Sequence, residues 1–235
     1  SPGGSSSGSA AAVADRMIPL AIGTQTGGSV IRPAAYCGVY GYKATYDLLS
    51  FAGVRHLAEA FDNLGCMART LDDIALFRSV LMAIPPRPIG AGVETPPRIA
   101  FCRTPHWQEA QDATRELIED TAGRLATAGA DVVDFELPPS FDGILDLTWR
   151  VTHFECARCF AYDYAEHPET ISGAVRDAVE AGRAVPYERY IEGLKTLGSL
   201  RNEMHAMLDG FDAILTPSAV GEAPLGLSDT GPITF

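Results

Sequence analysis

Two short loops of glycine and serine, separated by one helix and one strand, constrain this 235-residue chain more than any other feature. The first loop runs over residues 3–9 and the second is Gly27-Gly28-Ser29, so Ser5 and Ser29 stand 24 residues apart. That interval holds an alanine-rich helix (about 10–16) and a short apolar strand (18–23). Both loops can therefore return to one edge of a sheet, where glycine backbones expose N–H donors suited to an oxyanion hole.

A longer composite pattern surrounds the two loops and covers nearly a third of the chain. Its parts are Gly3-Gly4-Ser5-Ser6, Ser9-Ala10-Ala11, residues 19–29, residues 32–38, Gly41-Tyr42-Lys43, Asp62-Asn63-Leu64-Gly65 and Met67-Ala68-Arg69-Thr70. On these residues the segment resembles the amidase signature family of serine amidohydrolases. The resemblance implies an α/β fold, with a large mixed β-sheet surrounded by helices. It also implies one domain over residues 1–235, with a signature core over 1–83 and a helical, substrate-side region over 98–217.

The resemblance assigns a role to each residue of the two loops. Ser29 becomes the nucleophile, and Ser5, preceded by a cis peptide bond, becomes the relay that carries its proton. The N–H groups of Thr26, Gly27 and Gly28, together with that of Ser29, form the oxyanion hole. For Ser5 there is a plain structural alternative, because a serine in this position also caps the N-terminus of the following helix.

The base that completes this triad in the family is a neutral lysine well upstream of the first loop, and no residue precedes Ser1 here. Lys43 belongs to a later structural motif and Lys195 to a distant helix, so neither is assigned the role. Both ends of the chain look cut, which predicts an incomplete domain. Without its base a serine hydroxyl is a weak nucleophile, so a second hypothesis is a catalytically silent fragment or a subunit that serves as a scaffold. The third hypothesis is an amidotransferase A-type subunit.

Arg32 follows the nucleophile by three residues. A guanidinium beside the scissile bond suits bidentate binding of a substrate carboxylate, which predicts a small carboxylate-bearing amide as substrate. The alternative is a structural arginine that donates hydrogen bonds to loop carbonyls. The expected reaction is hydrolysis of a carboxamide to a carboxylic acid and ammonia through an acyl-enzyme, with no cofactor and no metal.

Composition narrows the partners. A net charge of −12, with the arginines spread along the chain, disfavours a nucleic-acid partner. Apolar runs are much shorter than the ~20 residues that cross a bilayer, so no membrane partner is expected.

An odd number of irregularly spaced cysteines predicts reduced thiols and a cytoplasmic location. One triplet, His153, Cys156 and Cys159, has helical spacing but lacks a fourth ligand for structural zinc. Whether the protein forms a homodimer is left open.

The rest of the chain alternates helices and strands, as in an α/β domain. We expect a helix over 71–82, a proline-rich surface connection over 85–97, a strand at 98–102, a long helix over 109–128 and a strand at 132–135. Residues 140–209 are predicted to be helical, with breaks near His167-Pro168 and between Gly182 and Pro186. A last strand is expected at 213–216.

Overall fold

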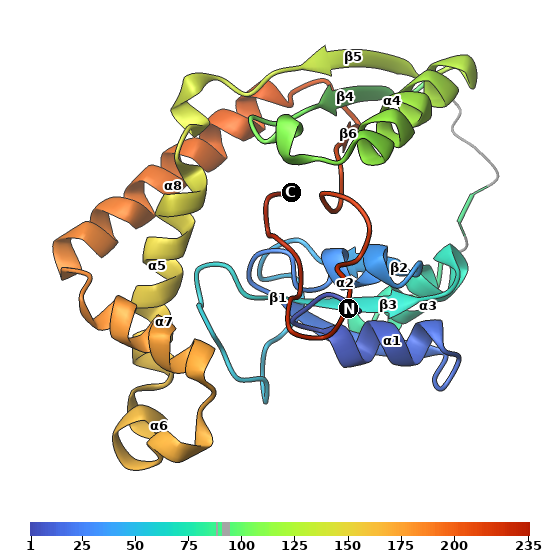
Figure 1. Cartoon of the computed structure of the whole chain (residues 1–235). Coiled ribbons are helices and arrows are strands. Elements are labelled where there is room, and N and C mark those ends of the chain that lie inside the picture. The colour runs from blue at the N-terminus through green and yellow to red at the C-terminus, as the bar shows by residue number, and fades with distance from the viewer. Residues whose placement is uncertain (88, 91–94) are drawn as a thin grey trace. The chain divides into compact units, whose positions relative to one another are not determined.

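The computed structural model covers residues 1–235, and the structure describes all of them except residues 88 and 91–94 (Figure 1). The connection predicted over 85–97 therefore lies partly outside the described residues. The fold is mixed α/β, as the sequence predicts. The chain divides into two compact units. The first comprises residues 1–50, 63–137 and 210–235, and the second comprises 51–62 and 138–209.

The first unit contains an antiparallel sheet with the strand order β1-β3-β2. Its strands are β1 (Leu20–Gln25), β2 (Tyr40–Lys43) and β3 (Asn63–Ala68). The central strand β3 is buried along its whole length, and a Cβ on Gly65 would lie 2.4 Å from the carbonyl oxygen of Tyr42. Only glycine permits so close an approach of neighbouring strands. The sequence predicted no strand here, because a fully buried strand lacks the alternation of polar and apolar residues.

Three helices accompany this sheet: α1 (Ser7–Ala14), α2 (Ile31–Tyr36) and α3 (Leu71–Leu81). The α3 helix begins at a capping threonine, since the Thr70 hydroxyl accepts a hydrogen bond from the N–H of Asp73 at 3.1 Å. Apolar side chains from α1, the start of α2 and the sheet form one buried cluster, which consists of Ala10, Val13, Ala21, Val30, Ala34 and Met67. This cluster anchors the two serine loops, because one loop leads into α1 and the other joins β1 to α2.

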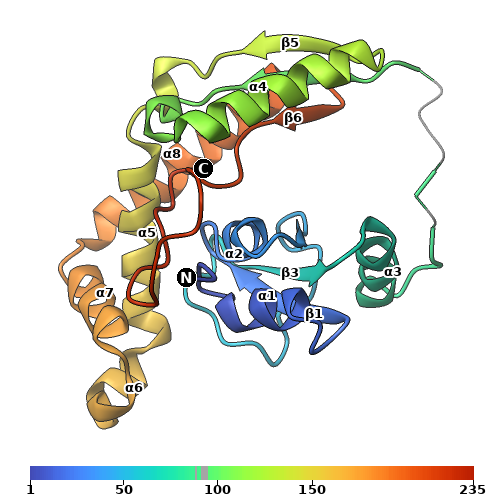
Figure 2. The same ribbon diagram turned by 45° about the vertical axis from the view of Figure 1, so that its right-hand side comes forward.

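A second, parallel sheet of the same unit has the order β5-β4-β6. Its strands are β4 (Arg98–Cys102), β5 (Asp131–Phe135) and β6 (Ala213–Leu215), and α4 (Asp112–Thr127) runs beside them (Figure 2). A 3₁₀ turn, Trp107–Glu109, precedes α4. The predicted strands and the long helix are confirmed here to within three residues at every end.

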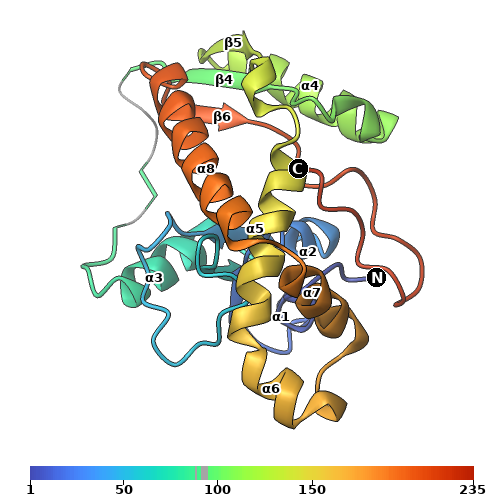
Figure 3. The same cartoon turned by 90° about the vertical axis from the view of Figure 1, so that its left-hand side faces the viewer.

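The second unit is a group of helices: α5 (Ile144–Cys159), α6 (Ala161–Glu166), α7 (Gly173–Arg183) and α8 (Tyr187–Met207). Here α5 packs against α7 and α8 (Figure 3). A Cβ on Gly182 would lie 1.8 Å from the carbonyl oxygen of His153, so glycine is needed where α7 meets α5. Both predicted helix breaks are confirmed. In the described part of the chain, no helix is long and apolar enough to cross a membrane.

The two units divide the chain differently from the expected regions 1–83 and 98–217, since residues 98–137 and 210–217 belong to the first unit and residues 51–62 to the second. A buried carboxylate links residues 51–62 to the helices of the second unit. Glu155 on α5 is only 7% exposed, and it accepts hydrogen bonds from the N–H of Ala60 and the hydroxyl of Tyr190, each at 2.8 Å. Burial, and then the bond to Glu155, raises the pKa of Tyr190 to about 12. One side chain thus connects the 51–62 loop, α5 and α8.

Replacing Glu155 with alanine is expected to lower the free energy of unfolding by about 2–5 kcal/mol, since two half-buried donors, the N–H of Ala60 and the hydroxyl of Tyr190, would lose their acceptor. Urea denaturation followed by far-UV circular dichroism measures the change. Glu188→Ala serves as the control, because Glu188 lies exposed on α8. Equal unfolding midpoints for wild type and Glu155→Ala would show that this carboxylate does not hold the loop.

Candidate active site

Ser29 lies in the tight connection between β1 and α2, and a buried glutamine shapes that connection. Gln25 ends β1 and is 8% exposed. Its side-chain oxygen accepts hydrogen bonds from the N–H groups of Val30 at 2.8 Å and Ile31 at 3.0 Å. The backbone directly after Ser29 is therefore fixed by a side chain that precedes the loop. The sequence analysis includes Gln25 in the composite pattern but does not predict this role. The feature that could have indicated it is a polar residue at the end of an apolar strand.

The first serine loop lies directly beside the second. The peptide bond between Gly4 and Ser5 is cis, as predicted. The N–H of Ser6 donates to the carbonyl oxygen of Ser29 at 3.1 Å. The hydroxyl of Ser6 accepts from the N–H of Thr24 at 3.2 Å, which ties the loop to β1 as well. The two loops thus meet at one end of the sheet, and the contact between the hydroxyls of Ser5 and Ser29 remains a prediction.

The residues assigned to the oxyanion hole line the turn before Ser29. Thr26 is half-buried, Gly27 is exposed and Gly28 is buried. The carbonyl oxygen of Gly28 accepts the N–H of Arg32 at 2.9 Å, which continues the helical turn back toward the loop. Because Gly27 and Gly28 carry no side chain, their backbone can approach a substrate closely. Their role in binding an oxyanion remains a prediction.

Arg32 is 4% exposed and hydrogen-bonded to two separate main-chain segments. Its Nε and Nη2 donate to the carbonyl oxygen of Gly4 at 3.3 and 2.8 Å, and its Nη1 donates to that of Gly231. Burial lowers the pKa of the guanidinium, and the nearby Tyr36 and Asp229 oppose that shift. These contacts are those expected of a structural arginine that donates hydrogen bonds to loop carbonyls. Binding of a substrate carboxylate by the same residue remains a prediction.

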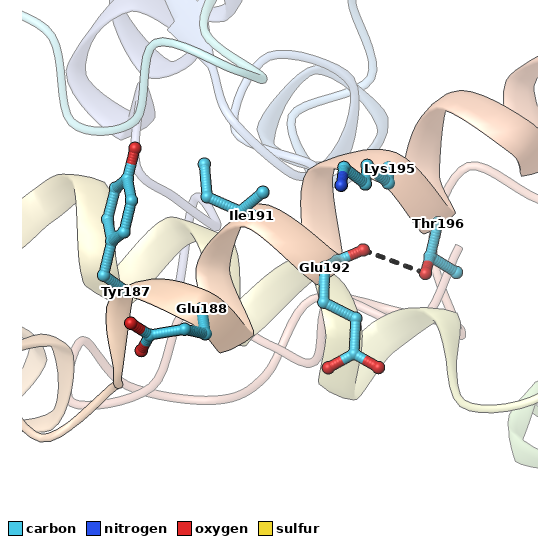
Figure 4. Close-up of a pocket in the computed structure, with 6 residues that line it drawn as sticks. All are labelled: Tyr187, Glu188, Ile191, Glu192, Lys195 and Thr196. Atoms are coloured by element: carbon cyan, nitrogen blue, oxygen red, sulfur yellow. Dashed lines mark hydrogen bonds between the residues drawn. The ribbon is translucent and has the colours of Figure 1, made fainter.

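The two lysines of the chain lie in different settings. Lys43, on β2, donates from Nζ to the carbonyl oxygen of Ala44 at 2.6 Å, and burial lowers its pKa. Lys195 lies on α8 in the second unit, beside a hollow of about 500 Å³. Figure 4 shows the six residues that line this hollow, all of which lie on α8. The Thr196 hydroxyl donates a hydrogen bond of 3.0 Å to the carbonyl oxygen of Glu192. The other lining residues are Tyr187, Glu188, Ile191 and Glu192.

The cysteines of the chain form no disulfide. All five are free, and they are Cys37, Cys66, Cys102, Cys156 and Cys159. Burial raises the pKa of Cys66 and of Cys156 to about 11, which keeps both as neutral thiols. Among the residues that the structure describes, no three His, Cys, Asp or Glu side chains are grouped to hold a metal ion.

Comparison with known proteins identifies the family. The family model described as "Amidase" matches residues 1–230. The chain belongs to the amidase family. A solved structure titled "Crystal structure of amidase" superimposes with a TM-score of 0.85 at 30% identity, over 96% of this chain and 51% of that one. The amidase signature fold expected from the sequence is therefore confirmed.

Among curated relatives, the amidase-family chain is similar to proteins named as the A subunit of glutamyl-tRNA(Gln) amidotransferase. The Thermus thermophilus protein is 49% identical over 98 residues, which are 41% of this chain and 20% of that protein. The Clostridium novyi protein is 30% identical over 254 residues, covering 93% of this chain and 52% of that protein. The chain thus spans about half the length of the relatives that it matches from end to end.

Proposed function

We propose that this protein hydrolyses a carboxamide to a carboxylic acid and ammonia through an acyl-enzyme on Ser29. The observation that carries the proposal is the meeting of the two serine loops, with a cis bond before Ser5 and the bond from Ser6 N–H to the Ser29 carbonyl. Membership of the amidase family and the likeness to a solved amidase support the reaction class.

In the proposed mechanism, the Ser29 hydroxyl attacks the amide carbonyl carbon while its proton passes to the hydroxyl of Ser5. Ser5 hands its own proton to a neutral lysine, which the family resemblance places before the first loop and outside these 235 residues. The N–H groups of Thr26, Gly27, Gly28 and Ser29 bind the negative oxygen of the tetrahedral intermediate. Its collapse returns the proton to the leaving nitrogen and releases ammonia. Water then cleaves the serine ester by the same route and frees the acid.

Arg32 extends the proposal to the substrate. Among the residues that the structure describes, three of its five N–H donors bind main-chain carbonyls, which leaves two for a carboxylate. A small amide that carries an acid group suits a guanidinium three residues after the nucleophile. This assignment depends on those remaining donors, and it is tested separately from the reaction itself.

A second candidate is an amidotransferase A-type subunit, which the similarity to the Thermus thermophilus protein favours. In that case glutamine is the amide hydrolysed, and the ammonia released serves a reaction of partner subunits. A third candidate, a scaffold without catalysis, follows if no lysine base joins the two serines.

A substrate screen separates the three candidates. The full-length protein is expected to release ammonia from simple amides, with rates that differ among aliphatic, aryl and carboxylate-bearing substrates. Ammonia is measured by a coupled dehydrogenase assay, with glutamine included alone and with partner subunits. Activity confined to glutamine and dependent on partners would favour the amidotransferase. If no amide yields ammonia, the scaffold without catalysis is the candidate that remains.

A further inference from the structure

Within the first unit, the C-terminal segment over residues 229–235, here called the strap, lies against both serine loops. In Figures 1 and 2 the red end of the chain runs past the N-terminus. A Cβ on Gly4 would lie 2.7 Å from Cγ2 of Thr230. A Cβ on Gly27 or on Gly28 would lie 3.1 or 3.5 Å from Cγ2 of Ile233. Ile233 is thus the side chain packed closest to the two glycines that precede Ser29.

Hydrogen bonds hold the strap on either side of Ile233. The carbonyl oxygen of Gly231 accepts a hydrogen bond from Nη1 of Arg32, and the N–H of Gly231 donates to Oδ1 of Asp229 at 2.8 Å. On the other side, the hydroxyl of Thr234 donates to Oε2 of Glu109 at 3.1 Å. Because both neighbours of the Pro232–Ile233 pair are held, the isoleucine side chain has a defined place over the loop.

We propose that Ile233 is a specificity-determining residue that limits the size of the acyl group beside Gly27 and Gly28. The inference rests on the proposed function. An acyl carbon bonded to Ser29, with its oxygen toward the loop N–H groups, places its substituent next to these glycines. A branched aliphatic side chain there offers contact to methylene groups and no hydrogen bond. Short alkyl amides are therefore favoured over longer ones, which collide with the isoleucine.

The test measures kcat/KM of the full-length protein for straight-chain primary amides from propionamide to hexanamide. One methylene in an apolar pocket changes discrimination by about tenfold or more. Ile233→Ala is expected to raise the ratio of kcat/KM for hexanamide over propionamide about tenfold, and Ile233→Val about threefold. Leu225→Ala is the matched control, since Leu225 lies in the same C-terminal region and is 98% exposed. Its ratio is expected to equal that of wild type.

The outcomes separate this inference from the proposed function. If wild type and variants release ammonia but Ile233→Ala and Ile233→Val keep the wild-type ratio, the inference is overturned and the hydrolase stands. If wild type releases no ammonia from any amide, the proposed function is overturned and the inference falls with it. Should Ile233→Ala fail to fold in a thermal melt, the smaller change in Ile233→Val still decides the matter.

Discussion

Ser29→Ala is expected to lower amide hydrolysis by the full-length protein at least about 10³-fold, because removal of a catalytic nucleophile leaves only binding and oxyanion stabilisation. The fold should remain, since Gln25 holds the turn through the N–H groups of Val30 and Ile31 and not through the serine hydroxyl. Steady-state release of ammonia measures the rate, and the thermal melt reports the fold.

The matched control for Ser29→Ala is Ser7→Ala, which removes a hydroxyl from the same part of the first unit at a position with no proposed role. It should retain the wild-type rate. Ser5→Ala should lose activity as well, because the proton of Ser29 would have no relay. A Ser29→Ala rate above a few per cent of wild type would remove Ser29 from the mechanism.

Local sequence pattern predicts most helices and strands of this chain, and it fails where a strand is buried by its neighbours. The strand at 98–102 and the helix at 71–82 carry their own periodicity, and both are found within one residue of the prediction. The central strand β3 was missed, because its burial comes from neighbours on both sides and not from alternation along its own residues. The cis bond before Ser5 came from the family resemblance, since nothing in the local sequence distinguishes cis from trans.

The residues of the candidate site also divide into those that a local sequence pattern reveals and those that only the folded chain brings together. Both serine loops are visible in the sequence because their glycines and serines are contiguous. The packing of Ile233 on Gly27 joins residues about 200 positions apart, and no local pattern links an isoleucine near a proline to a distant loop. Gln25 acts through one side-chain oxygen whose direction only the folded strand determines.

The second large effect concerns Arg32. Arg32→Ala is expected to lower the free energy of unfolding by about 3–5 kcal/mol, because hydrogen bonds to a charged group contribute about 1.5–3 kcal/mol each and two carbonyls would lose their donor. Urea denaturation measures this loss. Arg124→Ala is the control, since Arg124 lies exposed on α4 in the same unit.

Kinetics on a matched pair of amides then tests whether Arg32 also binds substrate. Lysine keeps the charge but loses the planar fork, so it cannot reproduce bidentate binding. Arg32→Lys is expected to lower kcat/KM for succinamate at least about tenfold more than for butyramide, which lacks the carboxylate. Equal losses on both substrates, together with a lower unfolding midpoint, would reject the carboxylate contact. Arg32 would then be a positioning residue that joins the loop before Ser5 to the strap through the carbonyls of Gly4 and Gly231.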